Sequence, residues 1–124
     1  MPKTVLIVED EALIVKVLTI RLEGLGYKVL AAYDGEAGLE MAKSTRPDLA
    51  VLDIGLPKLD GNTLCELLKT EPETKGIKVI MLTGKKLVGD METAFKSGAD
   101  VYVNKPYEWP RLLAQVKKLL GEHA

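Results

Sequence analysis

Five short, mostly apolar runs recur along the chain, and segments with helical periodicity fill the intervals between them. Apolar runs rich in branched residues, with little polar alternation, are typical of strands that are buried on both faces of a parallel sheet. Glycine, proline and polar residues end each run. The predicted strands are Thr4–Val8, Tyr27–Ala32, the run from Pro47 to Asp53, Ile77–Leu82 and Val101–Val103.

Each predicted strand is followed by a segment in which apolar residues return at helical spacing. Asp34-Gly35 and Asp60-Gly61-Asn62 precede two of these segments, as helix-capping residues do. Pro110 is compatible with the last helix because it falls in the first turn. The predicted helices are Ala12–Leu25, Glu36–Ser44, Thr63–Lys69, 89–97 and Glu108–Leu120.

The apolar positions of the first and last helices predict which of their faces pack against the sheet. We expect Leu13, Val17, Ile20 and Leu25 to form the apolar face of the first helix. The last helix has a longer apolar set, and we expect this set to point inward. Its members are Leu112, Leu113, Val116, Leu119 and Leu120.

Alternation of buried strands with helices predicts right-handed crossovers and a parallel α/β sheet that is covered on both faces. The length of 124 residues predicts one domain over residues 1–124. The net charge of -1 leaves no basic footprint for nucleic acid or an anionic membrane. The single cysteine, Cys65, excludes an internal disulfide framework. With no signal peptide and no membrane-spanning run, we expect a soluble cytoplasmic protein.

Polar side chains gather where the predicted strands end. Glu9 and Asp10 follow the first strand, Asp53 ends the third, Thr83 follows the fourth and Lys105 follows the fifth. The carboxyl ends of parallel strands share one edge, so these groups converge, and ligands bind at that edge. Three carboxylates repel one another unless a cation lies among them, and Mg²⁺ suits such oxygen ligands. The lysine and the hydroxyl add partners for phosphoryl oxygens.

Four sequence motifs resemble the receiver domain of two-component response regulators, and together they cover essentially the whole chain. The resemblance implies a flavodoxin-like (βα)5 three-layer sandwich with a five-stranded parallel sheet in the order 2-1-3-4-5. It also implies a phosphorylation-controlled signalling switch that catalyses only its own phosphorylation and dephosphorylation. The motifs are V-L-I-V-E-D-E at 5–11, D-I-G-L-P-K-L-D-G at 53–61, M-L-T-G at 81–84 and S-G-A-D-V-Y-V-N-K-P at 97–106.

By this resemblance, Asp53 is the phosphoacceptor. The phosphoryl group would come from a sensor histidine kinase or a histidine phosphotransfer protein. Glu9 and Asp10 would hold Mg²⁺ together with Asp53 and the backbone carbonyl of Gly55. This metal ion is the cofactor that the resemblance implies.

The resemblance assigns the remaining roles to residues after the fourth and fifth strands. Thr83 and Lys105 would contact the phosphoryl group, and Tyr102 would be the aromatic switch residue. A cis peptide would fall at Lys105-Pro106. The fourth helix, fifth strand and fifth helix would form the surface that an unidentified downstream protein reads. Phosphorylation-dependent homodimerisation stays open, as does the question of whether the chain is part of a longer regulator.

Two alternative functions are weighed against this one. An aspartate-nucleophile phosphatase carries a second acid two residues after the nucleophile, where this chain has Gly55. A phosphorylation-independent binding module of the same fold lacks an acidic or lysine position, whereas all of these are present here. Residue by residue, Tyr102 is equally compatible with a half-buried core tyrosine, and Trp109 with packing on Tyr107 or with an exposed docking patch.

Overall fold

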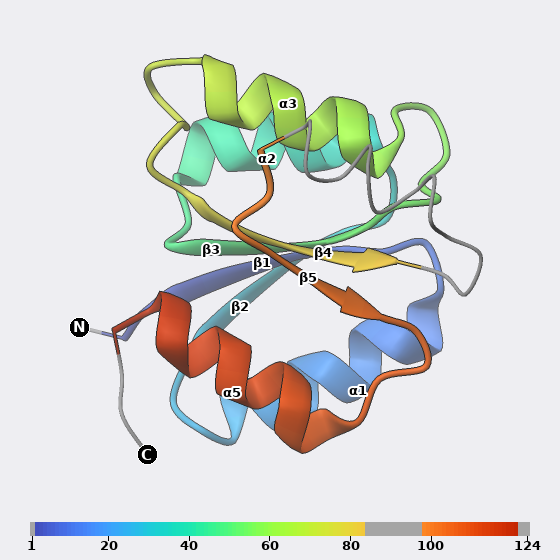
Figure 1. Cartoon of the computed structure of the whole chain (residues 1–124), viewed down its shortest axis with the longest axis vertical. Coiled ribbons are helices and arrows are strands. Elements are labelled where there is room, and N and C mark those ends of the chain that lie inside the picture. The colour runs from blue at the N-terminus through green and yellow to red at the C-terminus, as the bar shows by residue number, and fades with distance from the viewer. Residues whose placement is uncertain (1, 84–97, 122–124) are drawn as a thin grey trace.

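The structure, a computed structural model, describes residues 2–83 and 98–121, which form a parallel sheet with helices on both faces (Figure 1). The helix predicted at 89–97 and the tail from 122 lie outside these ranges. The strands are β1 (Thr4–Val8), β2 (Lys28–Ala32), β3 (Leu49–Asp53), β4 (Lys78–Thr83) and β5 (Val101–Asn104). The helices in the described residues are α1 (Ala12–Glu23), α2 (Gly35–Thr45), α3 (Gly61–Thr70) and α5 (Trp109–Leu119).

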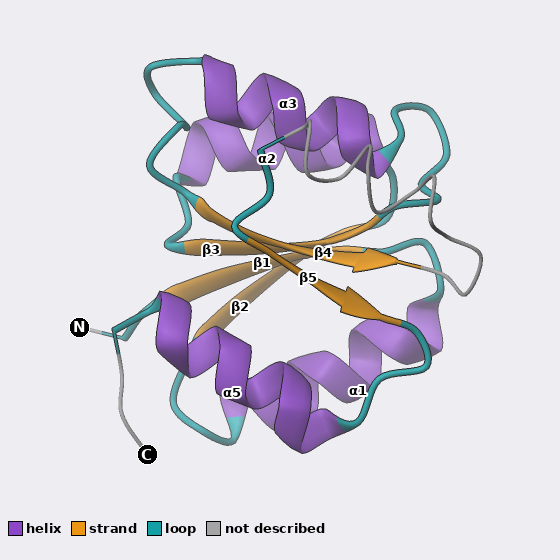
Figure 2. Cartoon of the chain, in the orientation of Figure 1, coloured by secondary structure: helices purple, strands orange, loops and turns teal. Residues whose placement is uncertain are grey.

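The strand order is β2-β1-β3-β4-β5, and every neighbouring pair is parallel. The predicted fold class and strand order are therefore confirmed. The helices α2 and α3 cover one face of the sheet, and α1 and α5 cover the other (Figure 2). Because all strands run the same way, their carboxyl ends lie along one edge.

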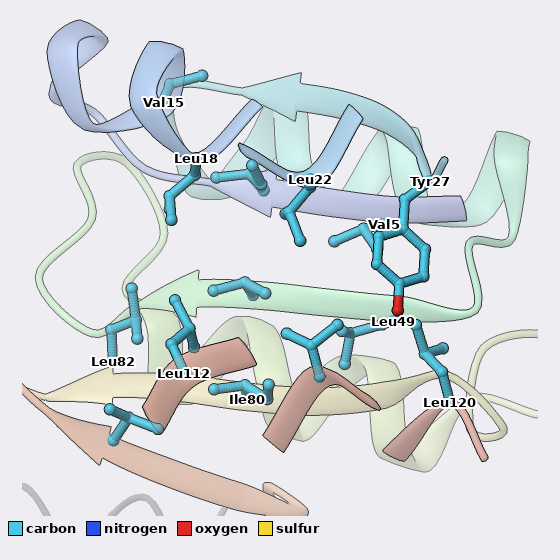
Figure 3. Packing of buried hydrophobic residues seen from close by; sticks show 14 residues of the cluster. Val5, Val15, Leu18, Leu22, Tyr27, Leu49, Ile80, Leu82, Leu112 and Leu120 are labelled. Carbon is cyan, nitrogen blue, oxygen red and sulfur yellow. The ribbon is translucent and has the colours of Figure 1, made fainter. Parts of the chain in front are cut away.

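The central strands are buried on both faces, which explains their unbroken apolar sequences. Every residue of β3 is buried, as are four of the five residues of β1. One hydrophobic cluster lies between the sheet and the helices α1 and α5 (Figure 3). A second cluster lies on the opposite face and includes Cys65, which is fully buried, as expected of a small core hydrophobe.

The prediction for the packing face of α1 is wrong. Its predicted apolar face is exposed, whereas Val15, Leu18 and Leu22 pack into the first cluster. The cause is that α1 is apolar on more than one side, so helical spacing alone allows two solutions. The exposed fractions of the predicted set are 72% for Leu13, 42% for Val17, 60% for Ile20 and 49% for Leu25.

The capping residues predicted for α2 and α3 are confirmed, although the helices begin at Gly35 and Gly61, one and two residues earlier than predicted. The carboxylate of Asp34 accepts a hydrogen bond from the backbone N–H of Ala37 at 2.8 Å, and Asp60 accepts one from Thr63 at 2.9 Å. Each satisfies an N–H that the first helical turn leaves without a partner. In α5, Pro110 lies in the first turn as predicted, and Leu112 and Val116 are buried. None of the helices in the described ranges combines the length and apolar character that crossing a membrane requires.

Gly61 allows α3 to begin directly against the end of β3. Its N–H donates to the carbonyl of Ile54 at 3.0 Å. A Cβ atom at this position would lie 2.3 Å from the carbonyl oxygen of Asp53 and 2.8 Å from the Cα of Ile54. These are backbone atoms, which cannot move aside as a flexible side chain can. The absence of a side chain at Gly61 therefore sets where the backbone of Asp53 lies.

We predict that Gly61→Ala lowers the free energy of unfolding by about 2 kcal/mol, because the added methyl group collides with the backbone of β3. Gly76→Ala is the matched control, since a Cβ there meets nothing within 4 Å and the backbone lies outside the left-handed region. We expect the control to leave stability unchanged or slightly raised. Urea denaturation measures both, and equal stabilities for the two variants would contradict the prediction.

Candidate functional site

The sheet brings four of the predicted site residues together at its carboxyl edge. Glu9 and Asp10 follow β1, Asp53 ends β3 and Lys105 follows β5. The ammonium of Lys105 lies 2.8 Å from Oδ1 of Asp53 and 3.2 Å from Oε1 of Glu9. Carboxylate oxygens of Glu9, Asp10 and Asp53 all lie within 4.8 Å of one another. The predicted convergence of three carboxylates and one lysine is therefore confirmed.

The three carboxylates differ in their exposure to solvent. Glu9 is 1% exposed and Asp53 is 8% exposed, whereas Asp10 is open to solvent. Glu9 lies deepest, and its Oε2 accepts a hydrogen bond from the backbone N–H of Glu11 at 3.2 Å. Glu9 therefore forms the buried end of the cluster, and solvent reaches the cluster at Asp10.

Burial and neighbouring charges shift the pKa values of two groups in this cluster. Burial raises the pKa of Glu9, and the negative charge of Asp53 adds to that rise. The backbone hydrogen bond from Glu11 and the charge of Lys105 only partly oppose it. For Lys105, burial acts to lower the pKa, but the hydrogen bond to Asp53 and the two carboxylate charges raise it overall. The ammonium is therefore charged at neutral pH and stabilises two buried carboxylates.

The donor set fits a hard divalent cation. Carboxylate oxygens are the ligands that Mg²⁺ prefers in proteins, and an accessible side leaves room for the water molecules that this ion keeps. Three carboxylates against one ammonium leave an excess of negative charge within a small volume. A Cβ atom at Gly55, in the turn after β3, would still lie 4.0 Å from Oδ2 of Asp53. Gly55 therefore places no side chain of its own next to this carboxylate oxygen.

Thr83 makes a contact that the sequence analysis did not anticipate. Its side chain is fully buried, and its hydroxyl donates a hydrogen bond to Oδ1 of Asn104 at 2.8 Å. Thr83 and Asn104 are direct cross-strand partners at the ends of β4 and β5. Asn104 had no predicted role, although its position next to Lys105 at a strand end was a signal that could have singled it out.

Tyr102 lies on β5 opposite Met81 and is partly buried against the second hydrophobic cluster. Strand residues two apart share a face, so Tyr102 and Asn104 project from the same side of the sheet as Thr83. The tyrosine therefore combines a half-buried position with a place on the same face as the Thr83 hydroxyl.

The loop between β5 and α5 is anchored by aromatic packing. The peptide bond between Lys105 and Pro106 is cis, as predicted. Tyr107 and Trp109 both pack against the first hydrophobic cluster, and the guanidinium of Arg21 lies 5.1 Å from the centre of the Trp109 ring. Trp109 therefore packs rather than standing free on the surface. The loop that carries Lys105 is thus tied to both α1 and the core.

Comparison with known proteins relates the chain to one family. The family model described as response regulator receiver domain matches residues 5–117. The polar-differentiation response regulator DivK from Brucella anthropi is 36% identical over 122 residues, covering 98% of this chain and 99% of that protein. The DNA-binding dual master transcriptional regulator RpaA from Synechocystis is 42% identical over 120 residues. These residues are 97% of this chain and 49% of RpaA, so the chain spans about half the length of that relative.

Two solved structures share the fold. A CheY-like response regulator receiver domain protein from Methanospirillum hungatei has a TM-score of 0.91 at 32% identity, covering 98% of this chain and 95% of that one. The receiver domain of a sensor histidine kinase from Pseudomonas aeruginosa has a TM-score of 0.89 at 28% identity, covering 98% and 100%. That second structure contains a magnesium ion coordinated in its active-site cleft.

We predict that Lys105→Met lowers the free energy of unfolding by about 2 kcal/mol at neutral pH without divalent cations. The variant leaves two buried carboxylates without their positive partner, and the partial exposure of the Lys105 side chain keeps the cost below that of a fully buried pair. Lys58→Met is the control, because the Lys58 side chain is 63% exposed and lies 3.7 Å from Asp34, a longer ion pair than those of Lys105. We expect the control to cost no more than about 0.5 kcal/mol. Equal losses in urea denaturation would contradict a charge-balancing role for Lys105.

Proposed function

Because the chain belongs to the family of response regulator receiver domains, we propose that Asp53 accepts a phosphoryl group from a histidine of a sensor kinase or phosphotransfer protein. One observation carries this proposal. Oδ1 of Asp53 is held at 2.8 Å by the Lys105 ammonium within a cluster of carboxylates at the open edge of a parallel sheet. A nucleophile with a fixed cation beside it suits a reaction that depends mostly on positioning and charge neutralisation.

In the proposed reaction, a carboxylate oxygen of Asp53 attacks the phosphorus of the phosphohistidine in line. The new P–O bond forms as the P–N bond to the donor breaks, and the electron pair of that bond stays with the imidazole nitrogen. Lys105 holds Oδ1, which leaves Oδ2, next to Gly55 and its missing side chain, as the attacking atom. The product is an acyl phosphate on Asp53, which water later hydrolyses.

Other residues of the site have proposed roles in neutralising the charge on the transferred group. Lys105 binds one phosphoryl oxygen as a point charge, and the Thr83 hydroxyl donates to another. Glu9, Asp10 and Asp53 would hold Mg²⁺, together with the backbone carbonyl of Gly55. When bound, this ion supplies further neutralisation of negative oxygen charge.

We further propose that phosphorylation changes the surface around β5 and α5. Movement of the Thr83 hydroxyl toward the phosphoryl group would open space on the face of the sheet that Tyr102 shares. Such a switch shifts the balance between two arrangements that both exist beforehand. The fourth helix of the proposed surface, at 89–97, lies outside the described residues.

The partners and context of the switch are also proposals. DivK, which the chain matches along almost its whole length, is a response regulator, and RpaA is about twice as long and binds DNA. We propose that residues 1–124 act as one receiver domain that works through protein contacts in the cytoplasm, with phosphorylation-dependent homodimerisation as one form of output. The chain would change its own covalent state rather than turn over an external substrate.

We predict that acetyl phosphate adds one phosphoryl group to the wild type in the presence of Mg²⁺, and that Asp53→Asn abolishes the adduct. Asparagine keeps the shape of the side chain but lacks the nucleophilic carboxylate. Asp48→Asn is the control: Asp48 lies just before β3, away from the site, and accepts a hydrogen bond from the N–H of Thr4. Intact-protein mass spectrometry reads the adduct. An adduct on Asp53→Asn would refute the assignment, and steady release of phosphate from a generic phosphomonoester would favour a phosphatase.

We also predict that Asp10→Asn weakens Mg²⁺ binding by about tenfold or more, because it removes the most accessible carboxylate of the cluster. Glu11→Gln removes the same charge one residue further along, outside the cluster. Isothermal titration calorimetry with MgCl₂ compares the two variants with the wild type. A similar loss in both would mean that general negative charge, rather than a defined ligand set, attracts the ion.

A further inference from the structure

The hydrogen bond between Thr83 and Asn104 links the ends of β4 and β5 at the proposed phosphorylation site. The Thr83 hydroxyl is the donor and Oδ1 of Asn104 is the acceptor, at 2.8 Å. Thr83 is fully buried, whereas Asn104 lies at the exposed rim of the sheet. Asn104 is followed directly by Lys105, whose ammonium contacts Asp53 at 2.8 Å. The end of β5 thus supplies both an acceptor for the threonine and a donor for the aspartate.

A hydroxyl group has one proton and donates one full hydrogen bond at a time. The Thr83 hydroxyl therefore cannot donate to Asn104 and to a phosphoryl oxygen together. We propose that Asn104 is a positioning residue that holds the Thr83 hydroxyl in the unphosphorylated arrangement and thereby sets the balance of the switch. This inference rests on the proposed function, since it requires Thr83 to contact the phosphoryl group.

The backbone around this hydrogen bond limits how the Thr83 hydroxyl can change its acceptor. The N–H of Lys105 donates to the carbonyl of Thr83 at 2.6 Å, which continues the pairing of the two strands past Asn104. With the strand ends paired in this way, rotation about χ1 of Thr83 is enough to move the hydroxyl to another partner. A β-branched side chain has few allowed χ1 rotamers, so the hydroxyl moves between discrete positions. The choice of acceptor therefore selects one of two distinct states.

The size of the expected population shift follows from the net free energy that one hydrogen bond contributes. Losing it favours the arrangement that accepts a phosphoryl group by about fivefold, which corresponds to about 1 kcal/mol. As long as the competent arrangement is the minor one in the free protein, a ligand that binds only this arrangement binds more tightly by the same factor. Asn104 thus lowers the response of the site to a phosphoryl group rather than contributing to its binding.

The test measures the affinity for beryllium fluoride, which mimics a phosphoryl group on a carboxylate, at a fixed Mg²⁺ concentration. The bound fraction is read from the amide signals of Thr83 and Asn104, or of the residues that replace them, in ¹H–¹⁵N NMR spectra. The variants are Asn104→Ala, which removes the acceptor, and Asn104→Thr, which restores one because paired threonines hydrogen-bond across strands. Both single-site changes are also made in a Thr83→Val background, which lacks the donating hydroxyl.

We expect Asn104→Ala to bind beryllium fluoride about fivefold more tightly than the wild type, and Asn104→Thr to return to within about twofold of it. In the Thr83→Val background the same substitutions should have no effect, a result that a merely structural role would not give. Unchanged or weaker binding by Asn104→Ala, or equal tightening without the Thr83 hydroxyl, would overturn the inference.

Asp53→Asn separates the hypothesis that Asp53 is the phosphoacceptor from the hypothesis that Asn104 positions Thr83. If it binds the mimic as the wild type does, or if no form binds, the proposed phosphoacceptor fails and the role of Asn104 with it.

Discussion

The contact of the Lys105 ammonium with Asp53 and Glu9 is the interaction on which the site depends. It joins the ends of β1, β3 and β5, three segments that lie far apart along the chain. The parallel sheet makes the contact possible, because its strand order brings these ends to one edge. Without the ammonium, two buried carboxylates would face each other at high electrostatic cost. The fold and the site are therefore coupled: the sheet assembles the charges, and the charges balance one another only in that sheet.

Burying two carboxylates at this edge costs the fold stability. Glu9 and Asp53 are removed from solvent, and burial raises the pKa of Glu9, which means that the ionised form is less stable there than in water. Apolar residues at these positions would cost the fold less. Close packing of the backbone of Gly61 against that of Asp53 holds this carboxylate in place. Buried charges that destabilise the fold are common at functional sites, where they interact with a ligand once it binds.

The strand β5 connects the site with the surface. It is an edge strand of four residues, and Val103 is the one among them that is buried. Tyr102 is partly buried, Asn104 is exposed, and Lys105 follows directly. Edge strands with few buried contacts shift at lower cost than central strands do. A change in the partner of Thr83 would therefore be transmitted through β5, while the buried β1 and β3 keep Asp53 fixed.

The sequence by itself determined the class of fold, the helix-capping residues and which charged side chains stand at the strand ends. Unbroken apolar runs of this length, alternating with helical segments, favour the middle of a covered parallel sheet, and Asp34 and Asp60 cap helices through contacts only three residues away. The family motifs are also local, and the match to receiver domains confirms them.

Only the tertiary structure decided which side of α1 is buried, since Leu13 and Leu18 are equally apolar and the position of the helix on the sheet selects between them. It also decided that Thr83 donates to Asn104, a contact across 21 residues that depends on strand register. Local patterns encode what one segment prefers, whereas the pairing of distant segments appears only when the whole sheet has formed.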